Sequence, residues 1–353
     1  MVGRNRSSLE MARAGAVLAA ERRHHRLHTD LSKRIDIFDI IERDNLWLMF
    51  QPLGNLYGSY LPVEGCAGIL INANHPLNLQ RLTASHEYGH FVLEHEVSLD
   101  EAESIQPQGS EHNLQEAAAQ TFAAYFLMPL QLVNTVLRSM GLPLKPENLT
   151  PVEAYDFSLE VGVSYSAAVN RLATLNKIPW RVANELRGQE PKSIKAEIGR
   201  GTRPQDVRAD VWGLDEHDSG KALYVRANDE LHILLPEAPS TGYIWTIDNT
   251  IISDLSKDVS EAESADRAFL ALVDESFQPN ARPGELRLGA GGLRRFVFRS
   301  LKPGKYTLQL VNRRPWQANS EGIKTFELFL DISANNTQGL RERQQESLLA
   351  IGA

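Results

Sequence analysis

The chain has 353 residues, 42% hydrophobic and 23% charged, a balance typical of soluble globular proteins. Its formal net charge of −8 at pH 7 disfavours unspecific nucleic-acid binding by the molecule as a whole. No run approaches the roughly 20 apolar residues of a membrane helix, and Glu10 and Arg13 interrupt the first apolar stretch, unlike the core of an export signal. With Cys66 as the single cysteine, the sequence predicts a cytoplasmic protein without internal disulfides.

Residues 1–200 predict a mostly helical domain that also carries a few strands. Apolar residues recur at helical spacing over 9–20, and 35–50 predicts a helix running into a strand. Turn-forming residues in 54–60 predict a hairpin tip, and the apolar run 68–72 predicts a strand. Further helices are expected in chain order over 78–95, 116–128 and 131–140, and from the capping pattern that begins at Thr150.

A basic cluster follows the first helix. The favoured interpretation is a solvated helix face, and the alternative is a contact with a nucleic acid or an acidic partner. Its members are Arg22, Arg23, His24, His25, Arg26 and His28.

The pattern changes after a polar, glycine-containing stretch between residues 192 and 208, which predicts a domain boundary. Seven short β-rich segments then follow at regular spacing, and this predicts an antiparallel β-sandwich over 208–335. The segments are 222–225, 231–235, 244–247, 268–273, 294–299, 304–311 and 326–332. Residues 336–353 read as a polar tail.

The motif His86-Glu87-Tyr88-Gly89-His90 lies in the expected helix 78–95. Residues four apart share one helix face, so the two imidazoles can bind one zinc ion while Glu87 lies beside them as general base. A catalytic zinc site needs a third protein ligand and an open position. Glu116 is the preferred third ligand because its neighbours are small or apolar. The rivals are Glu94, His95, Glu111 and His112.

A hairpin, the strand 69–72, the motif 86–90 and the run Glu116-Ala-Ala-Ala-Gln-Thr-Phe-Ala-Ala-Tyr-Phe-Leu-Met-Pro129 together resemble the ImmA/IrrE metallopeptidases. Glu116 occupies the place of that family's third zinc ligand. The sequence departs from the family at Gln120, where Asn is usual, and at Ala118, where a second acid is common.

This resemblance spans about residues 10–180 and implies a zincin-like zinc metalloendopeptidase. It further implies limited cleavage of a DNA-binding repressor, which switches on genes of mobile elements or a stress response. Residues 156–172 have the helix, glycine turn and second helix of a helix-turn-helix. The second helix carries one strong cation, Arg171, so packing against the peptidase, with a substrate-docking role, is favoured over DNA binding.

The second domain carries three loop motifs: Pro239-Ser240-Thr241-Gly242-Tyr243-Ile244-Trp245, Gly289-Ala290-Gly291-Gly292 and Arg314-Pro315-Trp316. In this order they resemble the chagasin-type inhibitors of papain-like cysteine peptidases, whose loops lie side by side at one end of an immunoglobulin-like sandwich. Departures occur at Ala238, where that family has Asn, and at Ser240, where it has Thr. The residues expected to bind protein are Thr241, Gly242, Tyr243, Gly289, Gly291, Gly292, Arg314, Pro315 and Trp316.

Two classes of function follow. The first is a zinc endopeptidase whose β-domain recognises substrate or regulates activity. The second is a non-catalytic zinc-containing sensor or inhibitor whose β-domain binds a cysteine peptidase. Glu87 favours the enzyme, because a structural zinc site needs no general base.

Overall fold

The computed structural model describes residues 2–62, 67–95, 110–248, 252–254, 268–280, 291–316, 324–334 and 338–341. The chain divides into two compact units, unit 1 with residues 1–188 and 336–353, and unit 2 with residues 189–335. The division falls earlier than the expected boundary because α9 (Pro191–Ile198) packs on β4 (Val211–Asp215). Among the described residues, none of the helices has both the length and the apolar character needed to cross a bilayer.

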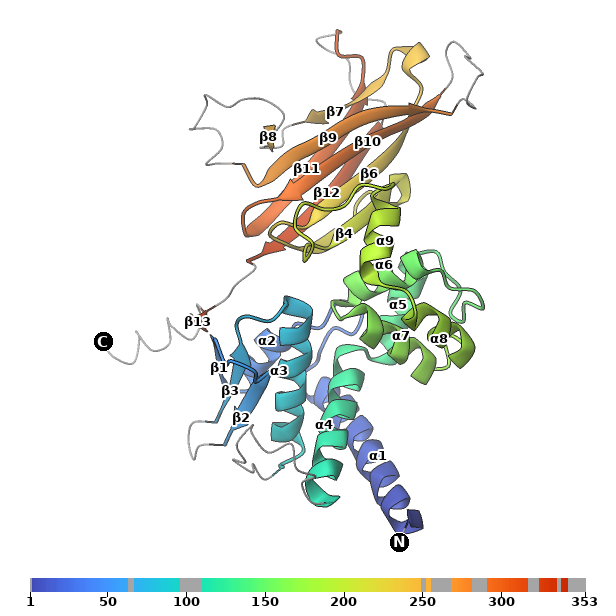
Figure 1. Ribbon diagram of the computed structural model, residues 1–353. Coiled ribbons are helices and arrows are strands. Elements are labelled where there is room, and N and C mark those ends of the chain that lie inside the picture. The colour runs from blue at the N-terminus through green and yellow to red at the C-terminus, as the bar shows by residue number, and fades with distance from the viewer. Residues whose placement is uncertain are drawn as a thin grey trace, which may run out of the picture. The chain divides into compact units, whose positions relative to one another are not determined.

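Unit 1 is built in layers: a small sheet, then α3, then α4 with α1 packed against it (Figure 1). The remaining helices, α5 to α8, form a second helical cluster in the same unit (Figure 1). The elements are α1 (Val2–Arg26), α2 (Ile37–Arg43), β1 (Trp47–Gln51), β2 (Gly58–Leu61), β3 (Gly68–Asn72), α3 (Leu77–Val92), α4 (Ser110–Leu127), α5 (Leu130–Ser139), α6 (Pro151–Val161), α7 (Tyr165–Thr174), α8 (Trp180–Arg187) and β13 (Gly339–Leu340).

The sheet of unit 1 has the strand order β13-β1-β3-β2, with β1 and β3 parallel and β2 antiparallel to β3. The expected hairpin tip at 54–60 is wrong in its second half, because Gly58 begins strand β2. A Cβ at Gly58 would lie 2.7 Å from the Leu70 carbonyl oxygen and 2.6 Å from Thr83 Cγ2, so this glycine serves close packing against β3 and α3. Two residues of the expected polar tail form β13 and pair with β1.

The helix signals in the sequence act as expected at α6. Thr150 Oγ1 accepts from the Glu153 backbone N–H at 3.2 Å, and Glu153 Oε2 accepts from the Thr150 N–H at 2.8 Å. This reciprocal pair satisfies two N–H groups that a helix start leaves without partners. Gly162 ends the helix with a φ of 71°, a left-handed conformation that glycine adopts without a Cβ clash. The turn leads directly into α7.

Unit 2 contains every one of the seven expected strands, together with β4 and β8, which the sequence pattern missed. They form a five-stranded sheet, β4-β6-β10-β9-β8, and a four-stranded sheet, β5-β12-β11-β7, which stack as two layers (Figure 1). The strands not yet bounded are β5 (Ala222–Arg226), β6 (Glu230–Glu237), β7 (Ile244–Asp248), β8 (Ile252–Asp254), β9 (Leu270–Pro279), β10 (Gly292–Ser300), β11 (Gly304–Arg313) and β12 (Lys324–Ser333).

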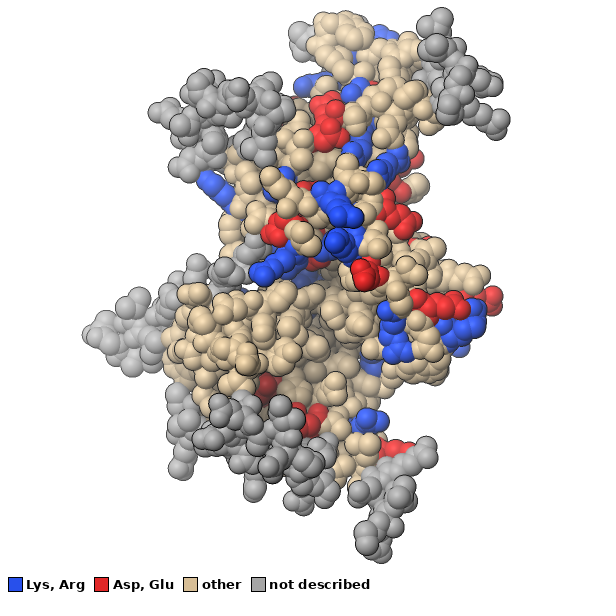
Figure 2. Space-filling model, viewed as in Figure 1, with Lys and Arg blue, Asp and Glu red and all other residues tan. Residues whose placement is uncertain are grey.

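The antiparallel arrangement expected for unit 2 is found in four strand pairs: β10 with β6, β10 with β9, β11 with β12, and β11 with β7. Three further pairs are parallel: β4 with β6, β8 with β9, and β5 with β12. Successive strands β4, β5 and β6 alternate between the two sheets, so no hairpin joins β4 to β6 and this pair is free to run parallel. The visible face of this unit carries interspersed positive and negative side chains (Figure 2). Arg294 also forms an ion pair with Glu237, whose side chain is buried, at 2.7 Å.

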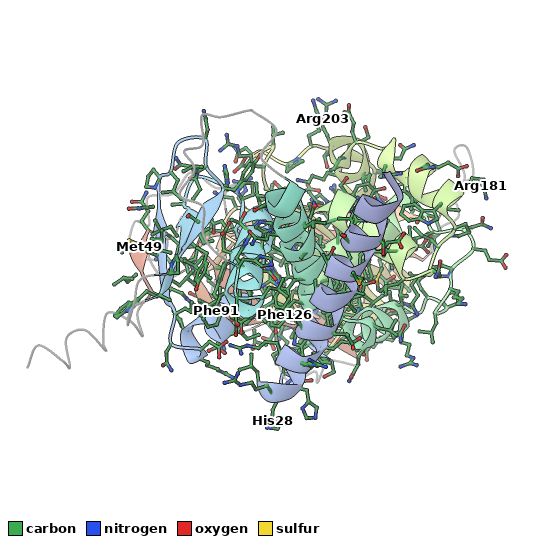
Figure 3. The ribbon with its side chains drawn as sticks, turned by 90° about the horizontal axis from the view of Figure 1, so that it is seen from below. His28, Met49, Phe91, Phe126, Arg181 and Arg203 are labelled. Carbon is green, nitrogen blue, oxygen red and sulfur yellow. The ribbon has the colours of Figure 1, made fainter. Side chains whose placement is uncertain are left out.

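The basic cluster at the end of α1 is only partly the solvated face that the sequence suggested. The Arg23 side chain is partly buried, at 10% exposure, and His24 is buried, at 4%. The His24 ring stacks on Phe126 of α4 with ring centroids 4.0 Å apart, and its Nε2 donates to the Phe126 carbonyl at 2.9 Å. Figure 3 labels Phe126 on α4 and His28, which lies just beyond the end of α1.

Burial of His24 predicts acid sensitivity of unit 1. Burial lowers the pKa of His24 to about 4, although its hydrogen bond to the Phe126 carbonyl acts in the opposite direction. The folded state therefore prefers the neutral ring. Its stabilising contribution is complete above the unfolded pKa of about 6.5 and is lost as the pH falls towards 4. Between pH 7 and pH 5 we expect this residue to remove about 2 kcal/mol of unfolding free energy.

The test compares His24→Gln, whose amide can still donate to the carbonyl but does not titrate, with His25→Gln on the exposed side of α1. Urea unfolding, followed by hydrogen exchange in α1 and α4 peptides, measures the stability of unit 1 at both pH values. His24→Gln should reduce the stability loss by about 2 kcal/mol, and His25→Gln should not. An equal loss in His24→Gln and the unaltered chain would contradict the assignment.

Candidate functional site

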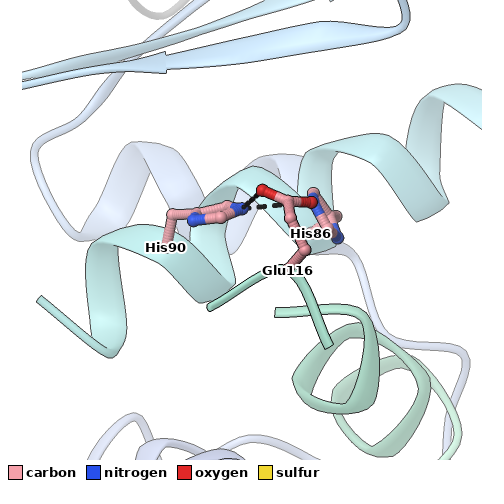
Figure 4. Close-up of side chains that lie close together, drawn as sticks. All are labelled: His86, His90 and Glu116. Atoms are coloured by element: carbon pink, nitrogen blue, oxygen red, sulfur yellow. Dashed lines mark hydrogen bonds and ion pairs between the residues drawn. The ribbon is translucent and has the colours of Figure 1, made fainter. Parts of the chain in front are cut away.

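The two motif histidines lie on one face of α3 and point to a common position (Figure 4). Their Nε2 atoms are 3.1 Å apart, and their ring centroids are 4.8 Å apart. The spacing of four residues produces this arrangement, because 3.6 residues make one helical turn. Both side chains are partly buried, with 24% exposure for His86 and 14% for His90.

Close packing of α4 on α3 brings the third side chain to the histidines. Gly89 lies between them in the motif, and a Cβ there would lie 3.0 Å from Phe122 Cδ1 of α4. One turn and a half earlier on α4, Glu116 reaches His86 Nε2 with its Oε2 at 3.2 Å and His90 Nε2 with its Oε1 at 3.4 Å (Figure 4). The Glu116 side chain is 42% exposed. Its contacts with the two histidines therefore hold it in place, since it is not fully buried.

The donor set fits a divalent metal ion. One ligand atom from each of His86, His90 and Glu116 lies within 4.8 Å of the other two. Two ligand atoms on a tetrahedral zinc ion are about 3.3–3.4 Å apart when each bond is about 2.0–2.1 Å. The two histidine Nε2 atoms are 3.1 Å apart, close to this separation. Each faces a different oxygen of Glu116, at 3.2 Å for His86 and 3.4 Å for His90. Within the described part of the chain, no second group of three such side chains meets the same criterion.

His95 supports His90 and is not placed as a ligand. Its Nδ1 lies 3.0 Å from His90 Nδ1, the ring nitrogen opposite the one that faces Glu116. A hydrogen bond at that nitrogen fixes the ring orientation of a ligating histidine. Glu94, another rival, is exposed just beyond the end of α3. The side chains of Glu111 and His112 lie outside the described part.

Glu87 is held next to the histidines by the sheet. Its Oε2 accepts a hydrogen bond from the Tyr60 backbone N–H of β2 at 2.9 Å. Burial raises the pKa of Glu87, and this outweighs the opposing effects of His86 and of the Tyr60 N–H. Burial alone would lower the pKa of His86, but the hydrogen bond that its ring donates to Glu116 and the charges of Glu87 and Glu116 raise it overall. The carboxylate therefore lies in a low-dielectric place suited to proton transfer.

Tyr88 anchors the motif helix from its buried side, a role that the sequence did not reveal. The residue is fully buried, and its hydroxyl accepts from Arg23 Nε at 2.6 Å and donates to the Asp44 carboxylate. Arg23 also forms an ion pair with Asp44. These contacts join α1 and the end of α2 to α3. Hydrophobic spacing alone carries no information on such a distant polar partner.

Two positions where the sequence departs from the ImmA/IrrE pattern lie on α4, the helix that carries Glu116. Gln120 is exposed on α4, and Ala118 is buried at 4% exposure.

The loops of unit 2 that were expected to bind protein meet at one end of the sheets. Gly242, with a φ of 80°, packs so closely on Trp316 that a Cβ would lie 2.8 Å from its Cζ2. Arg314 Nη2 donates to the Thr241 carbonyl at 3.2 Å, and its Cζ lies 4.7 Å above the centre of the Tyr243 ring. The first and third loops thus support each other.

Gly291 and Gly292, the described residues of the second loop motif, lie at the same end through the register of β10. Gly292 is paired with Glu237, the last residue of β6, directly before the first loop. A Cβ at Gly292 would lie 2.2 Å from the Gln278 carbonyl oxygen, so only glycine fits. Pro315 is exposed, and Trp316 is 69% exposed, large for an apolar side chain. Gly289 lies outside the described residues.

Comparison with known proteins assigns a different family to each unit. Residues 41–173 match the family described as the IrrE N-terminal-like domain, and residues 224–329 match the chagasin family of peptidase inhibitors, I42. These matches confirm both resemblances predicted from the sequence, over shorter ranges. Unit 1 therefore carries a metallopeptidase-type domain, and unit 2 carries a chagasin-like β-domain.

The similar proteins align with unit 2. Chagasin from Trypanosoma cruzi is 25% identical over 112 residues, which are 32% of this chain and 89% of that protein. Amoebiasin-2 from Entamoeba histolytica is 27% identical over 113 residues, which are 32% of this chain and 77% of that protein. A solved cysteine protease inhibitor from Entamoeba histolytica is 23% identical, covers 35% of this chain and 96% of its own, and has a TM-score of 0.27.

The geometry predicts that Glu116 holds the metal. We expect Glu116→Gln to lower metal affinity by at least about tenfold, because an amide oxygen is a weaker zinc ligand than a carboxylate. Zinc content by mass spectrometry after dialysis against a competing chelator provides the measurement. Glu94→Gln, the same change at an exposed residue just beyond the end of α3, should retain full zinc. Equal zinc retention in both variants would remove Glu116 from the ligand set.

Proposed function

We propose that unit 1 is a zinc-dependent endopeptidase with a zincin-like fold, which performs limited proteolysis of a protein substrate. The observation that carries this proposal is the convergence of His86, His90 and Glu116 beside a buried carboxylate, Glu87. A site that only stabilised the fold would not require Glu87 there. Bound by these three side chains, zinc would polarise the scissile carbonyl and acidify the attacking water.

The chain's own residues supply the proton transfers. Glu87 accepts the proton of the attacking water on its carboxylate and delivers it to the leaving amine. The Tyr60 N–H holds Oε2, which orients the carboxylate and leaves Oε1 for the proton. His95 fixes the His90 ring through its Nδ1, so the metal-binding nitrogen keeps its direction.

Strand β2 offers a place for an extended substrate. It is the last strand of its sheet, and its outer edge pairs with no other strand in the described ranges. Tyr60 in this strand contacts the catalytic carboxylate, so a peptide added along the edge would pass the metal-binding group. Strand addition of this kind supplies affinity through backbone hydrogen bonds and selects substrates in extended conformation.

The resemblance to ImmA/IrrE metallopeptidases supports a helix-turn-helix repressor as the substrate, and with it a role in a stress response or in the control of mobile elements. The cytoplasm is the proposed place of action, in keeping with the single cysteine. In this proposal unit 2, as an immunoglobulin-like domain, recruits the substrate or regulates cleavage through its loops. α7 packs within unit 1, since Arg171 is buried at 3% exposure and does not face a DNA backbone.

Catalysis is tested by Glu87→Gln in the full chain. This variant keeps the shape of the side chain and the acceptor for the Tyr60 N–H but cannot take a proton. We expect unchanged zinc content and a cleavage rate at least about 100-fold lower, the size of a general-base contribution. Cleavage of a repressor encoded beside the gene, followed by gel and mass spectrometry, is the readout. Wild-type cleavage by Glu87→Gln would refute the assigned base.

A second candidate function rests on unit 2: a zinc-containing sensor or inhibitor that binds a cysteine peptidase. The exposed Trp316, supported by Gly242 and Arg314, is the observation that favours it. A large exposed aromatic side chain on a rigid loop is typical of a protein-binding anchor. The family match of residues 224–329 supports a papain-like enzyme as that partner.

Trp316→Ala tests this candidate. If the loops bind a papain-like peptidase, the inhibition constant of the full chain should rise at least about tenfold, because an aromatic anchor contributes at least about 2 kcal/mol. Trp180→Ala is the matched control, since Trp180 is also exposed but lies in unit 1. Equal inhibition by the two variants would exclude Trp316 as the anchor. Inhibition by neither variant nor the unaltered chain would exclude the candidate function.

A further inference from the structure

Unit 1 contains a cavity whose lining residues do not include the metal-binding side chains. It has a volume of about 700 Å³ and is bounded by the end of α1, the junction of α4 with α5, and α7. This volume falls in the usual range of small-molecule sites. Its walls include Leu130, Leu175 and Tyr125, which supply apolar and aromatic surface, and the polar side chains of His24, Thr29 and Arg171.

Arg171 is the decisive residue in this cavity. It is 97% buried, because its exposure is 3%. Its Nε donates to the Met128 carbonyl at 3.0 Å, and its Cζ lies 3.6 Å above the centre of the Tyr125 ring. Its Nη1 has no hydrogen-bond partner, and within the described residues no carboxylate forms an ion pair with it. A guanidinium remains protonated in proteins, so a positive charge is buried without a counter-ion.

Two residues that line the cavity also have a buried polar atom without a hydrogen-bond partner: His24 Nδ1 and Thr29 Oγ1. His24 donates through Nε2 to the Phe126 carbonyl, which leaves Nδ1 as a lone-pair acceptor. Buried polar groups in native proteins are nearly always satisfied, by protein, water or ligand. Water could hydrogen-bond to these atoms, but it would not neutralise Arg171.

The acidic side chains of the walls limit the charge of an occupant. Glu21 and Asp30 line the cavity and are both exposed. Asp30 accepts a hydrogen bond from the Ser32 N–H and pairs with Lys33 at 3.3 Å. The carboxylates of Glu21 and Asp30 would both repel a doubly charged anion. An occupant with one negative charge, a hydroxyl donor and an apolar body satisfies the atoms that line this space.

We propose that this cavity binds a small organic acid, whose carboxylate pairs with Arg171 and whose hydroxyl donates to His24 Nδ1. The apolar body of the acid lies against Leu130, Leu175 and Tyr125. The cavity and the metal-binding group share α4, but Tyr125 follows Glu116 by nine residues, about 13 Å along the helix. Binding of the acid is therefore separate from the peptidase chemistry, and it can be measured directly.

The experiment titrates the full-length protein with hydroxy acids of increasing size, from lactate to mandelate, each beside its uncharged amide. Calorimetry at pH 7.5 and constant ionic strength, set with sodium chloride, measures the dissociation constants. We expect at least one acid to bind at least about tenfold more tightly than its amide, as a charge-assisted hydrogen bond to a buried guanidinium requires. Phenylacetate, which lacks the hydroxyl of mandelate, should bind more weakly than mandelate.

Three variants separate this site from a general charge effect. Arg171→Gln should weaken binding of the best acid at least about tenfold, and Arg181→Gln, the same change on an exposed arginine of α8, should not. Because Arg171→Gln could disturb folding, Leu130→Trp provides a second test: Leu130 is 51% exposed, and a larger side chain there fills the cavity from its open side. Leu130→Trp should also weaken binding while it keeps the circular dichroism spectrum.

The proposal is overturned if no acid binds more tightly than its amide. It is also overturned if Leu130→Trp, or a folded Arg171→Gln, binds the best acid as the unaltered protein does. A response to sodium chloride alone that equals the response to the acids would show an unspecific anion effect and would likewise refute it.

Discussion

The close approach of α3 and α4 is the constraint on which unit 1 depends. Gly89 lies between the two motif histidines, and its missing side chain lets Phe122 of α4 contact the backbone of α3. At this separation Glu116 reaches both imidazoles. A bulkier residue at 89 would push the helices apart, and the three ligand atoms would no longer lie at the distances that a tetrahedral ion requires. Packing and metal binding therefore rest on the same helix contact.

Buried polar contacts hold this helix pair in register with the rest of unit 1. Tyr88 is joined to Arg23 and Asp44, which connects the motif helix to α1 and α2, while Tyr60 of β2 holds the carboxylate of Glu87. Each of these groups would be costly to bury alone, so the contacts select one arrangement of the elements. The same cost applies to Arg171, whose buried charge lacks a protein counter-ion among the described residues.

Unit 2 organises a surface by a different route. Its first and third loops support each other through Gly242, Trp316 and Arg314, and the register of β10 with β6 brings Gly292 to the base of the first loop. The strands thus present an exposed aromatic side chain on loops that contact each other. Such an arrangement lowers the conformational entropy lost when a partner protein binds.

The sequence by itself determined the elements whose causes are local. Helical spacing put His86 and His90 on one face, Thr150 and Gly162 delimited α6, and seven strands of unit 2 were visible as β-rich segments. Tertiary structure alone decided contacts between distant segments: the parallel pairs β4–β6 and β5–β12, the addition of β13 to β1, and the burial of Arg171. These depend on which surfaces meet in space, whereas residue spacing reports only the period of each element and the face that it buries.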